Sequence, residues 1–162
     1  MSAAVEIAIE APAWNEFPGA EALVRRAVEA ALSDAAADVV EVSVLLTDDQ
    51  RMRALNRIWR GQDHATNVLS FPAPPAKDGA PQILGDIVLA YETVMREAAD
   101  QDIQARDHLA HLAVHGALHL LGYDHANERG AAVMEARERA ILAGLGVSDP
   151  YARSAMRAMA SP

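Results

Sequence analysis

The chain has 162 residues, of which 51% are hydrophobic, so it is long enough for one domain with a substantial core, and we expect a single domain over residues 1–162. It has no cysteine, which excludes disulfides and thiolate ligands, so any zinc site must use nitrogen or oxygen. No apolar run reaches the ~18 residues of a membrane span, and residues 1–20 lack the basic start of a signal peptide. We therefore expect a cytoplasmic protein.

The first third of the chain predicts a strand, a helix and a second strand. Residues 5–10 alternate apolar and polar side chains, which is typical of a half-buried strand. Residues 19–32 repeat apolar positions at helical spacing, and the β-branched run 39–46 indicates another strand. Oxygens of Thr47, Asp48 and Asp49 can then cap a helix that runs through Trp59.

That next helix has an apolar stripe and a basic one. We expect the apolar stripe to face the core; its members are Met52, Leu55, Ile58 and Trp59. Four arginines lie within ten residues without an acidic one, namely Arg51, Arg53, Arg57 and Arg60. They form a candidate RNA-binding stripe, although the net charge of −9 argues against it and arginines on a helix are often merely solvated. Arg60 ends the helix before Gly61, where its planar guanidinium can hold a phosphate.

The middle of the chain predicts two more strands. Residues 66–71 form one, which Pro72 closes, and residues 83–91 form the other. The proline-rich segment 72–81 between them is predicted to be a loop that leaves the fold or lies over the site. Asp86 has apolar neighbours and is either a partner of a metal ligand or an ordinary turn residue. A short helix is expected at 92–99.

Three histidines have a spacing that is typical of a metal site. Residues 103–121 are densely apolar and predict a buried helix on which His115 and His119 lie about 40° apart and about 6 Å along the axis. Gly122 can end this helix and turn the chain back, so that His125 joins the pair. Three imidazoles with a fourth position for water predict one catalytic zinc ion per chain.

Other polar residues surround this cluster. His111, one turn ahead of His115, is a candidate acid or base, or a residue that orients a ligand, or a hydrogen-bonded core residue. Asp124, in the turn before His125, is a possible partner of the ligands. Asn127 can cap a last helix that ends near Gly144. We expect Ala132, Val133, Ala136, Ala140 and Ile141 to face inward on this helix and Glu128, Glu135, Arg137, Glu138 and Arg139 to face solvent. The tail after about residue 147 is expected to be flexible.

The histidine spacing shares its framework with the zinc-peptidase motif H-E-x-x-H-x-x-G-x-x-H. In that motif a glutamate after the first histidine acts as the general base. Gly116 stands at that position here and has no side chain to accept a proton. The site therefore has a peptidase framework without the peptidase base, which indicates different chemistry.

The segment His-Gly-Ala-Leu-His-Leu-Leu-Gly-Tyr-Asp-His at 115–125 resembles the signature of the YbeY family of bacterial endoribonucleases, and segments 56–72 and 84–87 resemble its other signatures. The resemblance implies a zincin-like fold with a mostly parallel sheet and the metal in an open cleft. It implies single-strand-specific, metal-dependent RNA cleavage in maturation of the small-subunit ribosomal RNA 3′ end and in ribosome quality control. Expected partners are ribosomal RNA, the small subunit and assembly factors, but no DNA and no membrane.

Taken together, four strands among about five helices predict an α+β layer fold with a mixed sheet, to which the resemblance adds one antiparallel strand. The leading hypothesis is a zinc endoribonuclease with His115, His119 and His125 as ligands and Arg60 on the phosphate. Two alternatives are a zinc hydrolase of peptides or amides, and a non-catalytic ribosome-assembly factor with a structural metal.

Overall fold

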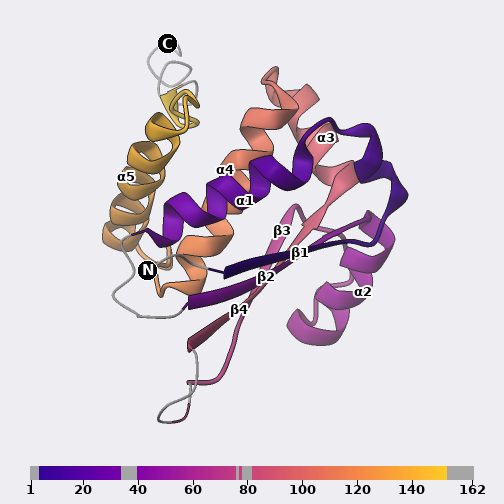
Figure 1. Cartoon of the computed structure of the whole chain (residues 1–162), viewed down its shortest axis with the longest axis horizontal. Helices are drawn as coiled ribbons and strands as arrows, with labels where there is room; N and C mark the ends of the chain where they lie inside the picture. Colours follow the sequence, from indigo (N-terminus) through magenta and orange to yellow (C-terminus); the bar gives the residue numbers. More distant parts are fainter. Residues whose placement is uncertain (1–3, 34–39, 76, 78–81, 153–162) are drawn as a thin grey trace.

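A computed structural model describes residues 4–33, 40–75, 77 and 82–152 of the chain. These residues form a four-stranded sheet with helices on both faces (Figure 1). The strands are β1 (Ala4–Ile9), β2 (Val40–Thr47), β3 (Val68–Pro72) and β4 (Gln82–Ala90), in the spatial order β1-β2-β4-β3. Strands β1, β2 and β4 are parallel and β3 is antiparallel to β4. The predicted α+β fold with one antiparallel strand is confirmed.

Five α-helices connect and cover the strands, as predicted. They are α1 (Ala20–Leu32), α2 (Asp49–Arg60), α3 (Tyr91–Gln101), α4 (Ala105–Leu120) and α5 (Glu128–Gly144). Two expected caps are present, because the Asp48 carboxylate accepts from Arg51 N and the Asn127 side chain accepts from Gly130 N. A short 3-10 helix, η1 (Pro12–Glu16), was not predicted; it buries Trp14, whose indole N–H donates to Thr47 O at 2.8 Å. None of the described helices is long and apolar enough to cross a membrane.

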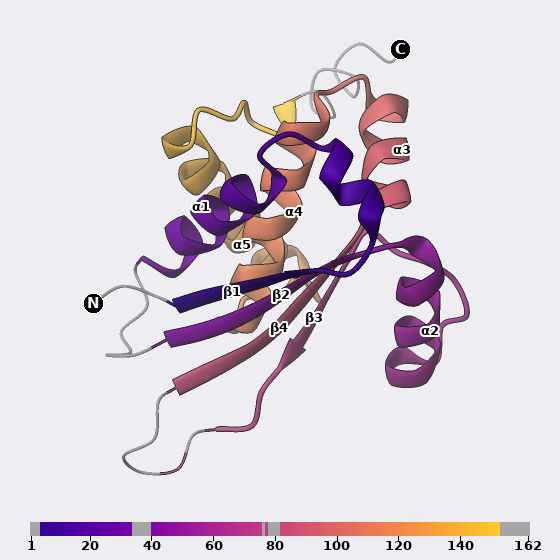
Figure 2. The same cartoon turned by 45° about the vertical axis from the view of Figure 1, so that its right-hand side comes forward.

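The sheet has apolar side chains on both faces because successive residues of a strand point to opposite sides. Val44, Leu46 and Ile87 belong to the main core, to which α1 and α4 contribute. Val88 and Ala90 point the other way and form a smaller cluster with Met52 of α2. Helix α2 thus lies alone against its face, while α1 and α4 cover the opposite one (Figure 2).

The predicted inward face of α2 is wrong in its second half. Met52 is fully buried, but Ile58 and Trp59 are 65% and 66% exposed. Ile58 lies off the stripe that begins at Met52. Trp59 lies in the last turn, where its ring packs edge-on against Phe71 with 6.4 Å between the ring centroids but remains open to solvent. A single helix lying on a sheet buries only one narrow stripe, so an apolar residue outside that stripe stays exposed.

The predicted orientation of α5 is wrong for most of its inward face, although Ile141 is buried and Glu128 and Arg139 are exposed as expected. Val133 is 55% exposed, whereas Glu138, expected in solvent, is completely buried. The alanines assigned to the core, Ala132, Ala136 and Ala140, are exposed as well. The buried stripe is Met134, Glu138, Ile141 and Leu142, at positions i, i+4, i+7 and i+8. Large side chains gain more from burial than alanines do, and Glu138 is buried because it has hydrogen-bond partners on α4.

Candidate metal centre

His115, His119 and His125 converge on one point, as their spacing predicted. One ligand atom from each lies within 4.8 Å of the other two, and the Nε2 atoms of His115 and His119 are 3.0 Å apart. Helix α4 supplies the first two rings. It ends at Leu120, Leu121 caps it, and Gly122 then adopts a φ of 100°, a conformation that favours glycine and reverses the chain toward His125. Tyr123 N donates to Leu118 O across this turn and fixes it.

The three histidines fit a divalent metal such as zinc by their donor chemistry. Imidazole binds a metal through a neutral nitrogen, so the protonated form must be disfavoured. Partial burial lowers the pKa of His119, and the neighbouring His115 and His125 lower it further. His125 is exposed at the rim, which leaves one side of the cluster open. An open side is what distinguishes a catalytic zinc site from a closed structural one.

Glu138 of α5 is the most important residue that the sequence did not assign to the site. Its Oε1 accepts from His115 Nδ1 at 2.6 Å, and its Oε2 accepts from His111 Nε2 at 3.0 Å and from the Tyr151 hydroxyl. Burial alone would raise the pKa of Glu138, but these hydrogen bonds outweigh burial and lower it to about 2. The pKa of Tyr151 is raised by burial and by its bond to Glu138. The carboxylate is therefore ionised and can only accept.

This network determines which nitrogen of His115 is available. Because ionised Glu138 accepts from Nδ1, that nitrogen carries the proton and Nε2 presents its lone pair toward His119. His111, His115 and Glu138 also bring ligand atoms within 4.8 Å of one another. Their contacts are those of a hydrogen-bonded group, and a carboxylate that holds a metal-binding histidine is a common supporting arrangement.

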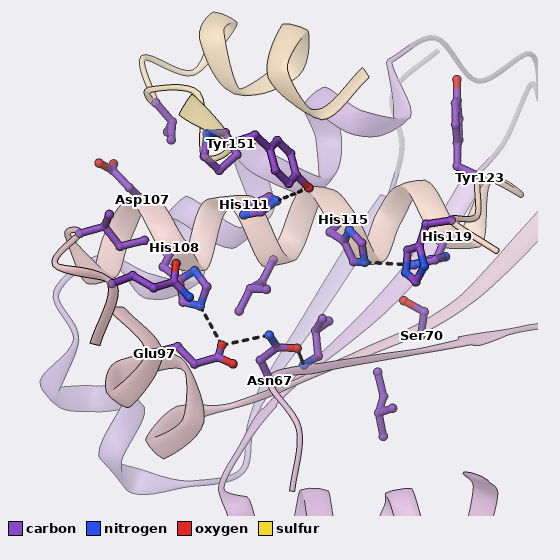
Figure 3. Close-up of a pocket in the computed structure, with 18 of the residues that line it drawn as sticks. Asn67, Ser70, Glu97, Asp107, His108, His111, His115, His119, Tyr123 and Tyr151 are labelled. Carbon is purple, nitrogen blue, oxygen red and sulfur yellow. Dashed lines mark hydrogen bonds and ion pairs between the residues drawn. The ribbon is translucent and has the colours of Figure 1, made fainter. Parts of the chain in front are cut away.

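A cavity of about 1170 Å³ opens along α4 beside the histidines. His111, His115, His119 and Tyr151 line one part of it, and Asn67, Glu97 and His108 line another (Figure 3). Gly116 lies on the side of α4 that faces the sheet, where a Cβ atom would meet Ile87 Cγ2 at 3.0 Å and Ser70 Oγ and Val68 Cγ2 at 3.3 Å. At the position that carries the base in the peptidase motif, a side chain would therefore fit only if these neighbours moved.

Arg60 reaches the cavity from the opposite side of the sheet. Helix α2 ends at Arg60 because Gly61 adopts a φ of 70°. The guanidinium then lies 5.3 Å from the centre of the Phe71 ring and donates from Nη2 to Ser70 O at 2.6 Å, on the edge strand β3. This bond holds the side chain, and no other group among the described residues accepts from the remaining N–H groups of the guanidinium. Arg60 lines the same cavity as the three histidines.

The other predicted residues lie farther from the histidines. Arg51 pairs with Glu10 at 3.6 Å, Arg53 forms two bonds to Asp63 at 2.9 and 3.1 Å, and Arg57 is exposed; none of these three arginines lines the cavity.

The sequence also predicted two aspartates as possible partners of the ligands, Asp86 and Asp124. Asp86 is exposed on β4 and does not line the cavity, so it does not support the ligands. Asp124 lines the cavity, and its Oδ1 accepts from Ala126 N at 2.9 Å, which stabilises the turn that carries His125.

Two segments with sequence predictions lie largely or partly outside the described residues. These are the proline-rich loop, of which 76 and 78–81 are outside, and the tail from 153 onward. The described part of the tail carries Tyr151 back to Glu138.

Known proteins of one family resemble this chain over most of its length. The family model described as Endoribonuclease YbeY matches residues 11–146. A protein named Endoribonuclease YbeY from Rhodopseudomonas palustris (strain HaA2) is 54% identical over 159 residues, which cover 92% of this chain and 82% of the relative. One of that name from Azorhizobium caulinodans is 49% identical over 152 residues, covering 91% and 96%. The solution structure of TM1509 from Thermotoga maritima shares the fold, with a TM-score of 0.53 at 23% identity over 90% of this chain and 97% of that one. The chain belongs to the endoribonuclease YbeY family.

Proposed function

We propose that this protein is a zinc-dependent endoribonuclease that cleaves single-stranded RNA. Its substrate would be ribosomal RNA during maturation of the small-subunit 3′ end and in ribosome quality control, in the cytoplasm, with the small subunit and its assembly factors as partners. The observation that carries the proposal is the convergence of three imidazoles and one arginine on a single open cavity. The name shared by the relatives supports the choice of RNA as substrate.

His115, His119 and His125 would hold the zinc, which when bound supplies a Lewis acid and lowers the pKa of a coordinated water. Glu138 keeps the His115 proton on Nδ1, so that Nε2 is ready to bind. Arg60 has free N–H groups near the cavity and would neutralise charge that develops on the phosphate.

His111 lies in the cavity wall and shares Glu138 with His115, which makes it our candidate for moving a proton. The identity of the attacking group, water or the ribose 2′-hydroxyl, is an outcome that the cleavage products reveal.

RNA outside the cavity would meet the arginines of α2. Arg57 is exposed, and within the described ranges it makes no ion pair as short as those of Arg51 and Arg53, although its charge helps to lower the pKa of Asp63, so it is the most available of them. Arg51 and Arg53 would first have to release Glu10 and Asp63, although exposed ion pairs of this kind are weak. We propose that the chain acts as one domain, because the same sheet supports α4 and positions Arg60.

Peptide hydrolysis is less well supported than RNA cleavage. A peptidase of this framework needs a carboxylate beside the metal to pass a proton to a poor amine leaving group. Gly116 stands at that position and is pressed against Ile87, and Glu138 is buried under the histidines with both oxygens engaged. Phosphodiester cleavage depends more on charge neutralisation, which a divalent ion and Arg60 supply.

The proposal is tested by assaying purified protein on single-stranded RNA, duplex RNA and casein, with zinc content measured in parallel. We expect about one zinc per chain, cleavage of single-stranded RNA, slower cleavage of duplex, and no peptide hydrolysis. His119→Ala should lose both zinc and cleavage, whereas His64→Ala, which alters an exposed histidine outside the cavity, should lose neither.

Three results would point elsewhere. Zinc-dependent casein hydrolysis that is lost in His119→Ala would identify a peptidase. Zinc binding without cleavage of any substrate would favour a structural metal in an assembly factor. Absence of zinc uptake would contradict the site itself.

A further inference from the structure

The cavity has a second polar cluster that the proposed chemistry does not use. It consists of Asn67, Glu97 and His108, contributed by the residue before β3, by α3 and by α4 (Figure 3). His108 Nε2 lies 2.9 Å from Glu97 Oε1, and Asn67 Nδ2 donates to the same oxygen at 2.9 Å. We refer to these three residues as the Glu97 cluster.

Its hydrogen bonds leave one acceptor open. Oε1 of Glu97 already accepts two bonds, which fixes the carboxylate and fills both lone pairs of that oxygen. In the part of the chain that the structure describes, no group donates to Oε2. The Glu97 side chain is 32% exposed, so Oε2 belongs to a wall that a ligand can reach.

His108 fixes the position of the Glu97 carboxylate. Its side chain is only 5% exposed, and its Nδ1 has no hydrogen-bond partner among the described residues. A buried, imperfectly satisfied histidine that holds a carboxylate toward a cavity is costly for a purely structural role. Asn67 is likewise fixed, because its Oδ1 accepts from Val68 N at 2.7 Å.

The charges near this cluster indicate which part of an RNA can bind there. Four carboxylates line the cavity, those of Glu97, Asp107, Asp124 and Asp149, and Asp149 is paired with Arg139 at 3.2 Å. Among the described residues Arg60 is the one arginine or lysine that lines it. The carboxylates of Glu97 and Asp107 repel a phosphate, so this part of the cavity favours an uncharged group with N–H donors. In single-stranded RNA the Watson–Crick edges of the bases supply such donors.

Guanine is the base that fits best. It presents an imino N–H and an amino N–H side by side, whereas adenine and cytosine present one amino group and uracil one imino N–H. Both N–H groups of guanine can donate together to the single open oxygen Oε2, whereas each other base brings only one N–H to that point. His108 and His115 are seven residues apart on α4, about 10 Å along the helix axis, so base and reacting phosphate would come from the same or neighbouring nucleotides.

We propose that the Glu97 cluster is a guanine-binding subsite that sets the base preference of RNA cleavage. This proposal rests on the proposed function for its biological meaning, but base binding itself can be measured without cleavage. The informative variant is Glu97→Gln, because it keeps Oε1 for Asn67 and His108 and replaces the acceptor Oε2 with an NH₂ donor. Asp100→Asn is the matched control, since it removes a carboxylate from an exposed position of the same helix that does not line the cavity.

The first experiment titrates zinc-loaded protein with guanosine, inosine and adenosine 5′-monophosphates and follows the side-chain amide signals of Asn67 by NMR. Inosine lacks the amino group of guanine and keeps the imino N–H. We expect affinity to fall in the order guanosine, inosine, adenosine, and Glu97→Gln to abolish that order while Asp100→Asn preserves it. Equal binding of the three nucleotides, or no change at Asn67, would overturn the subsite.

The second experiment compares kcat/KM for otherwise identical unstructured RNAs that carry a single guanine or a single adenine. We expect a preference for guanine of about tenfold, which Glu97→Gln removes or reverses. Cleavage that ignores the base, or a preference that Glu97→Gln leaves intact, would refute the subsite and leave the nuclease proposal standing. Guanosine binding at Asn67 without cleavage of any RNA would support the subsite and refute the nuclease proposal.

Discussion

At the scale of single residues, Glu138 has the largest predicted influence on the metal. It is completely buried, and it binds the proton that His115 must keep on Nδ1. Glu138→Gln preserves the volume but offers one oxygen where the carboxylate offers two, so it cannot hold His111, His115 and Tyr151 together. We predict that zinc affinity falls about 10–100-fold, the usual effect of losing such a partner. Competition with a chelator of known affinity measures it.

Glu135→Gln is the control for this substitution. Glu135 lies one turn earlier on α5, pairs with Arg139 at 4.0 Å and helps to raise the pKa of Tyr151 by its charge, but among the described residues it makes no hydrogen bond to the histidines. The zinc affinity of the Glu135→Gln variant should match that of the unaltered protein. If Glu138→Gln binds zinc equally well while remaining folded, the buried carboxylate contributes to packing and does not orient the ligand.

Arg60→Ala should reduce RNA cleavage by about two orders of magnitude, the scale expected for one group that stabilises charge in the transition state. Zinc content and thermal stability should change little, because Arg60 is exposed and its partner, Ser70 O, can be solvated on the edge strand. Arg60→Lys should recover only part of the rate. The comparison is kcat/KM beside Arg57→Ala, which lies outside the cavity. Unfolding of Arg60→Ala would mark the arginine as structural.

The sequence predicted which three histidines come together, but it did not predict the residues that hold them. His115, His119 and His125 could be paired because two lie within one helical turn and a glycine follows at the point of reversal. Glu138 and Tyr151 come from segments 13 and 26 residues after His125, and no local pattern connects them to it. The available signal was the stripe Met134, Ile141 and Leu142, into which Glu138 falls at helical spacing. A charged residue in that position indicates a buried partner.

At the scale of elements, the stability of two variants tests which face of α2 is buried. Met52 is fully buried against Val88 and Ala90, so Met52→Ala should lower the free energy of unfolding by about 2–5 kcal/mol. Ile58 is 65% exposed, so Ile58→Ala should change it by no more than about 0.5 kcal/mol. Urea denaturation of both variants decides whether the buried face of α2 includes Ile58. Equal losses would restore the inward orientation that periodicity suggested.

Helix α4 approaches β3 and β4 closely because Gly116 has no side chain. We predict that Gly116→Glu lowers stability by at least about 3 kcal/mol, because the new carboxylate would be driven into Ile87, Val68 and Ser70 without a partner. Gly144→Glu, which adds the same side chain where nothing lies within 4 Å, should be nearly neutral. Thermal unfolding compares them. A stable Gly116→Glu that hydrolyses peptides would contradict both the packing and the choice of substrate class.

Element type was predictable where element orientation was not. Alternating and β-branched runs specify strands, and capping residues such as Asp48 and Asn127 specify where helices begin, because both depend on neighbours in sequence. Which side of α2 or α5 is buried depends on what lies opposite. For α5 that is a pair of histidines on α4, and for the end of α2 it is the edge of the sheet. Neither is visible in the helix's own pattern.

At the scale of the whole molecule, a net charge of −9 must be reconciled with an anionic substrate. Of the four arginines of α2, two are paired with carboxylates, which leaves Arg57 and Arg60 as the two arginines of this helix best able to meet phosphates. For single strands the slope of log affinity against log salt is about −0.7 per phosphate contacted, so we predict a shallow slope of about −1.5.

Fluorescence anisotropy of unstructured RNA with His119→Ala, measured from low to moderate salt, gives this slope without cleavage. Arg57→Ala should flatten it by about 0.7, whereas Arg26→Ala, a control on the exposed face of α1, should not. A slope of about −3 or steeper in the unaltered arginine background would mean that Arg51 and Arg53 exchange their carboxylate partners for RNA.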